Sequence, residues 1–110
     1  MDKRDKILLG KILDETNIIV DLIRDYNCET FVKDEKTKRA TCMTLINIGE
    51  MVKLLSDDVK HDVPSIPWKS IAGLRDVAAH GYMTLSMEDI WETVSEDVPI
   101  LMIEIKKYIG

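Results

Sequence analysis

The sequence predicts an all-α fold, an antiparallel bundle of four to five helices. Apolar residues recur every three or four positions through most of the chain, and no segment shows the apolar–polar alternation of a strand. Only five Gly and three Pro interrupt the 110 residues, so the helical segments are long. A chain of this length with 45% hydrophobic residues can build one core, and we expect a single domain over residues 1–110.

Two helices are predicted in the N-terminal half. The first spans about 2–26 and ends at Asn27. Its apolar residues recur at helical spacing and are Ile7, Leu8, Ile12, Ile19, Leu22 and Ile23. The second helix is predicted over about 33–56. The residues expected on its buried side are Ala40, Met43, Ile46, Met51, Leu54 and Leu55.

The C-terminal half is predicted to contain a loop and two more helices. The segment 57–66 is polar and contains Pro64, which favours a loop. The next helix should begin at Pro67, because a first helical position needs no N–H donor, and should end near Gly81. The last begins after an N-cap at Ser86, and Pro99 within it predicts a kink or a break.

The charge balance limits the classes of function. A net charge of −5 argues against broad, unspecific nucleic-acid binding, which usually needs a basic face. Residues 61–110 hold 4 basic and 8 acidic side chains, so this half carries most of the excess. The two cysteines are too few for a disulfide scaffold and are expected to be reduced thiols. With no signal-peptide pattern and no long apolar run, we expect a cytoplasmic protein.

Few side chains are suited to acid–base chemistry near neutral pH. His61 lies in the polar loop and is expected to be a solvent-exposed histidine. His80 lies in the string Arg75-Asp76-Val77-Ala78-Ala79-His80-Gly81-Tyr82, where functional side chains surround one turn of small residues. Asp76 and His80 are four residues apart, so they share a helix face, and the carboxylate could orient the imidazole.

Arg75 and His80 do not share a helix face. Five residues place them about 140° apart around an ideal helix. The two side chains would converge only if the helix loosened at residues 79–81, or if a second copy completed the site across a two-fold axis. This geometry is a reason to expect a symmetric homodimer.

Several segments along the chain, together with the Arg75–Tyr82 string, carry a resemblance to a known family. They are Ile46-Asn47-Ile48-Gly49-Glu50, Pro67-Trp68-Lys69-Ser70-Ile71-Ala72-Gly73-Leu74-Arg75, His80-Gly81-Tyr82, Ile90-Trp91 and Asp97-Val98-Pro99. In this order they resemble the HepT toxin family of the HEPN superfamily. The signature of that family is Arg-x4-His-x-Tyr, matched here by Arg75, His80 and Tyr82.

The resemblance implies the toxin of a toxin–antitoxin system, a metal-independent ribonuclease built as a helical homodimer. The arginine and histidine of both subunits would meet in a cleft on the two-fold axis. RNA cleavage without a metal needs a base for the 2′-hydroxyl and a cation for the phosphorane. We expect His80 to act as that base or as the acid for the leaving oxygen, and Arg75 to hold the phosphate. Neither a metal nor a cofactor is expected.

The resemblance also implies a partner, a minimal nucleotidyltransferase that acts as the antitoxin. In similar families this enzyme adenylylates the motif tyrosine, which is Tyr82 here. The family usually has a polar residue, often Asn, at the position of Asp76. A carboxylate there adds negative charge to a site that must receive phosphate, although it can still orient His80.

Two other functions remain open from the sequence. The dimer could be a binding module that docks a nucleotidyltransferase or another nucleotide-handling protein with little nuclease activity, or a structural helical dimer. Trp68 and Trp91 are expected in the core or at an interface, and Lys38 and Arg39 on a solvated face. Glu88, Asp89, Glu92, Glu96 and Asp97 are expected to form a second solvated face.

Overall fold

All regular structure described in the chain is helical. The computed structural model describes residues 1–84 and 86–110, apart from the side chains of residues 75, 77 and 80–84. The elements within these ranges are α1 (Lys3–Ile23), α2 (Cys28–Lys33), α3 (Glu35–Leu54), α4 (Asp57–Asp62), α5 (Trp68–Thr84), α6 (Met87–Glu92), the π-helical segment η1 (Thr93–Asp97) and α7 (Val98–Ile109). The all-α prediction is confirmed.

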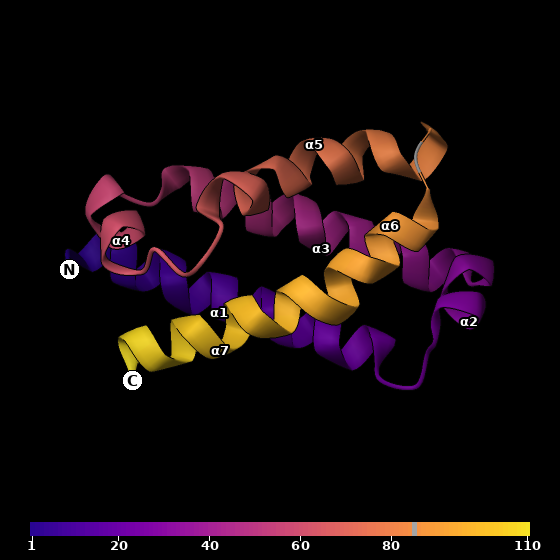
Figure 1. Cartoon of the computed structure of the whole chain (residues 1–110), viewed down its shortest axis with the longest axis horizontal. Coiled ribbons are helices and arrows are strands. Elements are labelled where there is room, and N and C mark those ends of the chain that lie inside the picture. Colours follow the sequence, from indigo (N-terminus) through magenta and orange to yellow (C-terminus); the bar gives the residue numbers. More distant parts are fainter. Residues whose placement is uncertain (85) are drawn as a thin grey trace.

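Four long elements form the bundle. Figure 1 shows α1, α3, α5 and the continuous α6–η1–α7 segment running alternately in opposite directions along the long axis. Helix α3 packs against both α1 and α5, and α7 packs against α1. The described residues form more helices than the four to five predicted, because α2 and α4 are short additions and η1 divides the last helix.

The first helix agrees with its prediction to within three residues. Asp2 caps it by accepting a hydrogen bond of 2.7 Å from the Asp5 N–H. Leu9, Ile12 and Ile19 are almost fully buried on one face. Ile7 belongs to another face and is half exposed.

A short helix, α2, was not predicted. The first helix ends at Ile23, with Arg24 as its C-cap, and not at Asn27 as predicted. Asn27 instead caps α2 in a reciprocal capping box with Thr30. Asp34 then ends α2 and caps α3, accepting from the Thr37 N–H at 3.0 Å. The helix predicted from residue 33 therefore begins at Glu35.

The predicted buried face of the second long helix was wrong. Ala40 is exposed, as are Met43 and Leu54, and Ile46 and Met51 are only partly buried. The side that packs inward carries Thr37, Thr41, Cys42, Thr44, Leu45, Ile48, Gly49 and Val52. Small threonines fill positions where larger apolar residues were expected, so counting only hydrophobic residues gave the wrong rotation. Of the expected residues, Leu55 is buried, just after the helix end.

The prediction of a loop over 57–66 was wrong for its first six residues, which form α4. Ser56 caps this helix through its side chain, which accepts from the Val59 N–H at 3.4 Å. Asp57 and Asp58 occupy the first turn, where carboxylates suit the helix dipole. Val59 is 1% exposed and anchors the turn in the core.

Helix α5 begins one residue after Pro67, and the Pro67 carbonyl accepts from the Ile71 N–H at 2.9 Å. The helix extends to Thr84, beyond the predicted end near Gly81. Trp68 is 8% exposed, and its indole N–H donates to the Val63 carbonyl at 3.0 Å. The expected core position of Trp68 is confirmed.

The last helical region shows the predicted disturbance at Pro99. Ser86 caps α6 as expected, by accepting from the Asp89 N–H. Thr93–Asp97 then forms a π-helical segment directly before α7, which has Pro99 in its first turn. Pro99 has no N–H to donate to the Ser95 carbonyl, so the regular α-helical ladder is interrupted there.

Polar contacts, one of them to a buried carboxylate, join distant parts of the bundle. Asp5 is 3% exposed and accepts two hydrogen bonds from Ser56, from the backbone N–H at 3.0 Å and from Oγ at 2.6 Å. These bonds hold the pKa of Asp5 below its ordinary value of 3.8. The Tyr108 hydroxyl donates to Asp62 at 2.8 Å and ties α7 to α4. That hydrogen bond raises the pKa of Tyr108.

We predict that Ile48→Ala destabilises the protein by about 2–5 kcal/mol, because Ile48 is fully buried on α3 and its truncation leaves a cavity. Ile103→Ala is the matched control, since Ile103 is 48% exposed and should cost much less. Urea unfolding of both variants measures the difference. Equal losses would contradict the central position of α3.

We also predict that Asp5→Asn lowers stability near neutral pH and loses this effect in acid. A lowered pKa means that the ionised Asp5 stabilises the fold above the ordinary carboxyl pKa. This contribution disappears as the pH falls through the lower pKa of the folded state. Thermal unfolding at neutral pH and at about pH 3 measures the change. Asp25→Asn, at an exposed position, is the control for loss of a carboxylate and should change the melting temperature at neutral pH much less than Asp5→Asn does.

Candidate functional site

The four residues singled out by the sequence lie on one helix. Arg75, Asp76, His80 and Tyr82 belong to α5, within a stretch that rises about 10 Å along the axis. The side chain of Asp76 is exposed and takes part in a polar interaction. The side chains of Arg75, His80 and Tyr82 lie outside the described residues.

The core-facing side of α5 fixes how this helix is rotated. Trp68, Ile71, Leu74 and Ala78 are all buried, at a spacing of three or four residues. Asp76 and Ala79 lie on the exposed side. The packing of α5 against α3 therefore holds the backbone of the motif at a fixed rotation relative to the bundle.

The backbone of α5 remains α-helical through residues 79–81. The loosening considered above as one way to bring Arg75 and His80 together is therefore absent. The positions of Asp76 and His80 are one helical turn apart, whereas those of Arg75 and His80 differ by about 140°. Within one subunit, the regular helix does not direct positions 75 and 80 to the same side.

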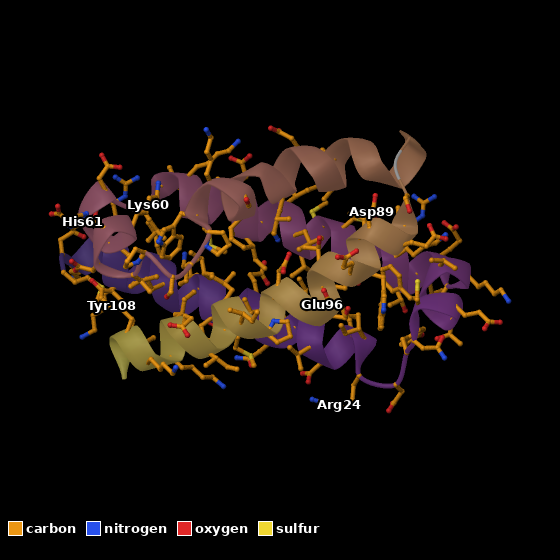
Figure 2. All side chains as sticks on the ribbon, viewed as in Figure 1. Arg24, Lys60, His61, Asp89, Glu96 and Tyr108 are labelled. Atoms are coloured by element: carbon orange, nitrogen blue, oxygen red, sulfur yellow. The ribbon has the colours of Figure 1, made fainter. Side chains whose placement is uncertain are left out.

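The other histidine lies far from the motif. His61 is exposed on α4, as expected, and Figure 2 shows it with Lys60 and Tyr108 at one end of the molecule. Helix α5 starts near that end and runs to the opposite one (Figure 1). Within the described part of the chain, no group of three or more His, Cys, Asp or Glu is arranged to hold a metal ion.

The end of α3 near the motif carries basic side chains that are already paired. Lys38 contacts Glu35 at 2.8 Å and its side chain is only 13% exposed, so the expected solvated position is wrong for this residue. Arg39 is 67% exposed, as expected, and contacts the same carboxylate at 3.5 Å. Lys33, on α2, contacts Glu29. Each of these basic residues has an acidic neighbour in the structure.

The cysteines and the second tryptophan have structural surroundings. Both cysteines are free thiols, and Cys42 is buried. Burial raises the pKa of the Cys42 thiol, which disfavours the reactive thiolate. Trp91 is partly buried, and its ring packs against Phe31 with the ring centroids 5.3 Å apart. The expected core role of Trp91 is confirmed.

The acidic face is confirmed. Glu88, Asp89, Glu92, Glu96 and Asp97 are all exposed along α6 and η1, and Figure 2 labels two of them, Asp89 and Glu96. The Ser86 hydroxyl donates to Glu88 at 2.7 Å, which lowers the pKa of that carboxyl. No helix in the described ranges, 1–84 and 86–110, has the length and apolar character needed to cross a bilayer.

A sequence profile described as "Ribonuclease HepT-like" matches residues 12–108, a range that includes the whole of α5. The chain belongs to the HepT-like ribonuclease family. The assignment by resemblance above is therefore confirmed.

Individual relatives agree with the family. "Putative RNase MJ0127" of Methanocaldococcus jannaschii is 38% identical over 99% of this chain and 91% of its own length. "Putative RNase TTE0752" of Caldanaerobacter subterraneus subsp. tengcongensis is 34% identical over 96% of this chain and 94% of its own. "Probable ribonuclease HepT" of Thermococcus cleftensis is 35% identical over 92% of each chain. No solved structure matches the chain significantly.

Proposed function

We propose that this HepT-like protein is a metal-independent endoribonuclease and the toxin of a HEPN/minimal nucleotidyltransferase system, acting in the cytoplasm. The observation that carries the proposal is the placement of Arg75, His80 and Tyr82 on one regular helix in a chain of the HepT-like ribonuclease family. The names of the relatives support ribonuclease chemistry.

The catalytic cleft requires two copies of the chain. Because α5 stays helical, positions 75 and 80 of one copy point about 140° apart. A two-fold axis beside α5 would let Arg75 of one subunit approach His80 of the other. The homodimer then supplies two arginines to one cleft, which offsets the acidic total charge locally.

The reaction in this cleft is transfer of a phosphoryl group within the RNA. The 2′-hydroxyl loses its proton to a base and the leaving 5′-oxygen gains one from an acid; His80 fills one of these two roles and water fills the other. The 2′-oxygen attacks phosphorus, the bond to the 5′-oxygen breaks, and Arg75 stabilises the charge on the phosphorane. The products are a cyclic phosphate end and a 5′-hydroxyl. Asp76 holds the imidazole of His80 in the required tautomer.

The partner nucleotidyltransferase controls the same helix. Attack of the Tyr82 hydroxyl on the α-phosphate of ATP, with pyrophosphate as the leaving group, would place a nucleotide and a phosphate charge two residues from His80. The added group would occupy the cleft and repel the phosphates of RNA. This position gives the antitoxin a chemical means to neutralise the toxin.

The exposed carboxylate of Asp76 favours a second candidate function. A negative charge beside the phosphate position weakens RNA binding, and a dimer with this defect would serve as a docking module for the transferase. Measured RNA cleavage separates the two functions.

We predict that His80→Ala and Arg75→Ala each reduce RNA cleavage at least about 100-fold, because each removes a group that acts in the transition state. His61→Ala and Arg24→Ala are matched controls at exposed positions and should keep the parental rate. The assay follows cyclic-phosphate ends on RNA in the presence of a chelator. Parental rates for the His80 and Arg75 variants, or a requirement for a divalent metal, would contradict the proposed mechanism. Absence of cleavage by the parental protein would favour the docking module.

We further predict that co-expression with the cognate nucleotidyltransferase adds the mass of an AMP group to Tyr82. Mass spectrometry of the peptide locates the modification, and Tyr108→Phe provides a control for another tyrosine. The modified protein should lose RNA cleavage. A neutralised complex with unmodified Tyr82 would contradict this regulation.

A further inference from the structure

The outer surface of α1 and α3 combines apolar ends with a charged centre. We call it the α1–α3 face, defined by Ile7, Lys11, Asp14 and Ile18 on α1 and by Met43, Asn47 and Leu54 on α3. Its four large apolar side chains are half exposed: Ile7 50%, Ile18 45%, Met43 58% and Leu54 51%. The charged and amide residues between them are exposed as well.

Hydrogen bonds fix how the two helices are aligned. Asp5 accepts from Ser56 near one end of the pair, and Asn47 Nδ2 donates to Glu15 Oε1 at 2.8 Å further along. The helices are antiparallel and adjacent (Figure 1), so each step forward on α1 matches a step backward on α3. Ile7 is therefore level with Leu54.

The same alignment places Ile18 level with Met43. The face consequently has one apolar pair at each end and polar residues between them. On α1, the intervals between Ile7, Lys11, Asp14 and Ile18 are four, three and four residues, which keeps all four positions on one stripe. This stripe has the same spacing from either end, and its two central charges are opposite.

We propose that the α1–α3 face binds the same face of a second copy of this chain, about a two-fold axis that crosses α1 midway between Lys11 and Asp14. In this arrangement the two α1 helices run antiparallel. Lys11 pairs with Asp14 of the partner subunit, and Ile7 packs on Ile18 of the partner subunit. The apolar ends of α3 meet in the same way, Met43 against Leu54 of the partner subunit.

Charge complementarity identifies the second copy as the occupant. A two-fold contact is self-complementary, so every pairing occurs twice. The antiparallel stripe gives two attractive Lys11–Asp14 pairings between subunits, whereas a parallel stripe would place like charges together. A membrane or an unrelated apolar peptide would need neither the opposite charges nor their symmetric spacing.

This contact goes beyond the proposed function, because it uses none of the residues of the motif on α5. It adds a second interface to any pairing of α5 helices. If α5 helices also pair, each chain has two contacts with other copies, one through α5 and one through the α1–α3 face. The two contacts together join dimers into larger assemblies.

A charge-swap experiment tests the contact. We expect Lys11→Asp and Asp14→Lys each to raise the dissociation constant of the contact at least about tenfold, because each places like charges opposite one another. Each variant alone should have a lower mass than the parental assembly in sedimentation or light scattering, at protein concentrations near the parental dissociation constant. An equimolar mixture of the two variants should recover the parental mass, since every central pairing is then attractive.

The mixture distinguishes contact between subunits from effects within one chain. A helix weakened by the loss of an internal Lys11–Asp14 attraction would not be repaired by adding a second protein. Lys106→Asp is the matched control, at an exposed position on α7, and should keep the parental mass. Circular dichroism checks that the variants remain helical. Unchanged mass in both single variants, or a mixture that stays at the reduced mass of the single variants, would overturn the proposal, as would a parental protein with no self-association through this face.

Discussion

The packing of α3 between α1 and α5 is the constraint on which the molecule depends. Leu45, Ile48 and Val52 lie on the buried side of α3 and have no measurable exposure, so its rotation cannot change without opening the core. This rotation in turn sets the position of α5, which carries the motif. It also decides which residues of α3 remain at the surface, and those residues form half of the proposed self-binding face.

Much of the architecture could be predicted from the spacing of apolar residues, but the rotation of α3 could not. Thr41 and Thr44 are buried there, although threonine is usually counted as polar, while Met43 is exposed. Short helices were also missed, because α2 and α4 depend on side-chain caps at Asn27 and Ser56 rather than on a long periodic pattern. Tertiary contacts such as that of Asp5 with Ser56 join residues far apart in sequence, and no local pattern reveals them.

The candidate site, like the fold, could be predicted from the sequence only in part. The spacing of Arg75, Asp76 and His80 was sufficient to place them on one helix, whereas Tyr82 lies beyond the end predicted near Gly81 and belongs to the helix because α5 continues to Thr84. The motif also indicated the family that the sequence profile confirms. How the site closes is a separate matter, because the helix continues past Gly81 and leaves no local bend to bring positions 75 and 80 together. In the proposed function the missing geometry comes from a second subunit, whose position would depend on surface complementarity rather than on periodicity within one chain.

The π-helical segment before α7 has a consequence for insertions and deletions. A π turn acts as one extra residue inside an α-helix, so the residues before and after it have separate helical phases. Deleting one residue from 93–97 would remove this extra residue and leave a regular α-helix in which the downstream residues keep their orientation, whereas in an uninterrupted α-helix the same deletion would rotate everything downstream by about 100°. Leu101 and Ile105 would therefore keep their buried positions after this deletion. This segment can therefore lose one residue without changing which residues of α7 face the core, and homologous chains that conserve the buried positions of α7 can differ here by one residue in length.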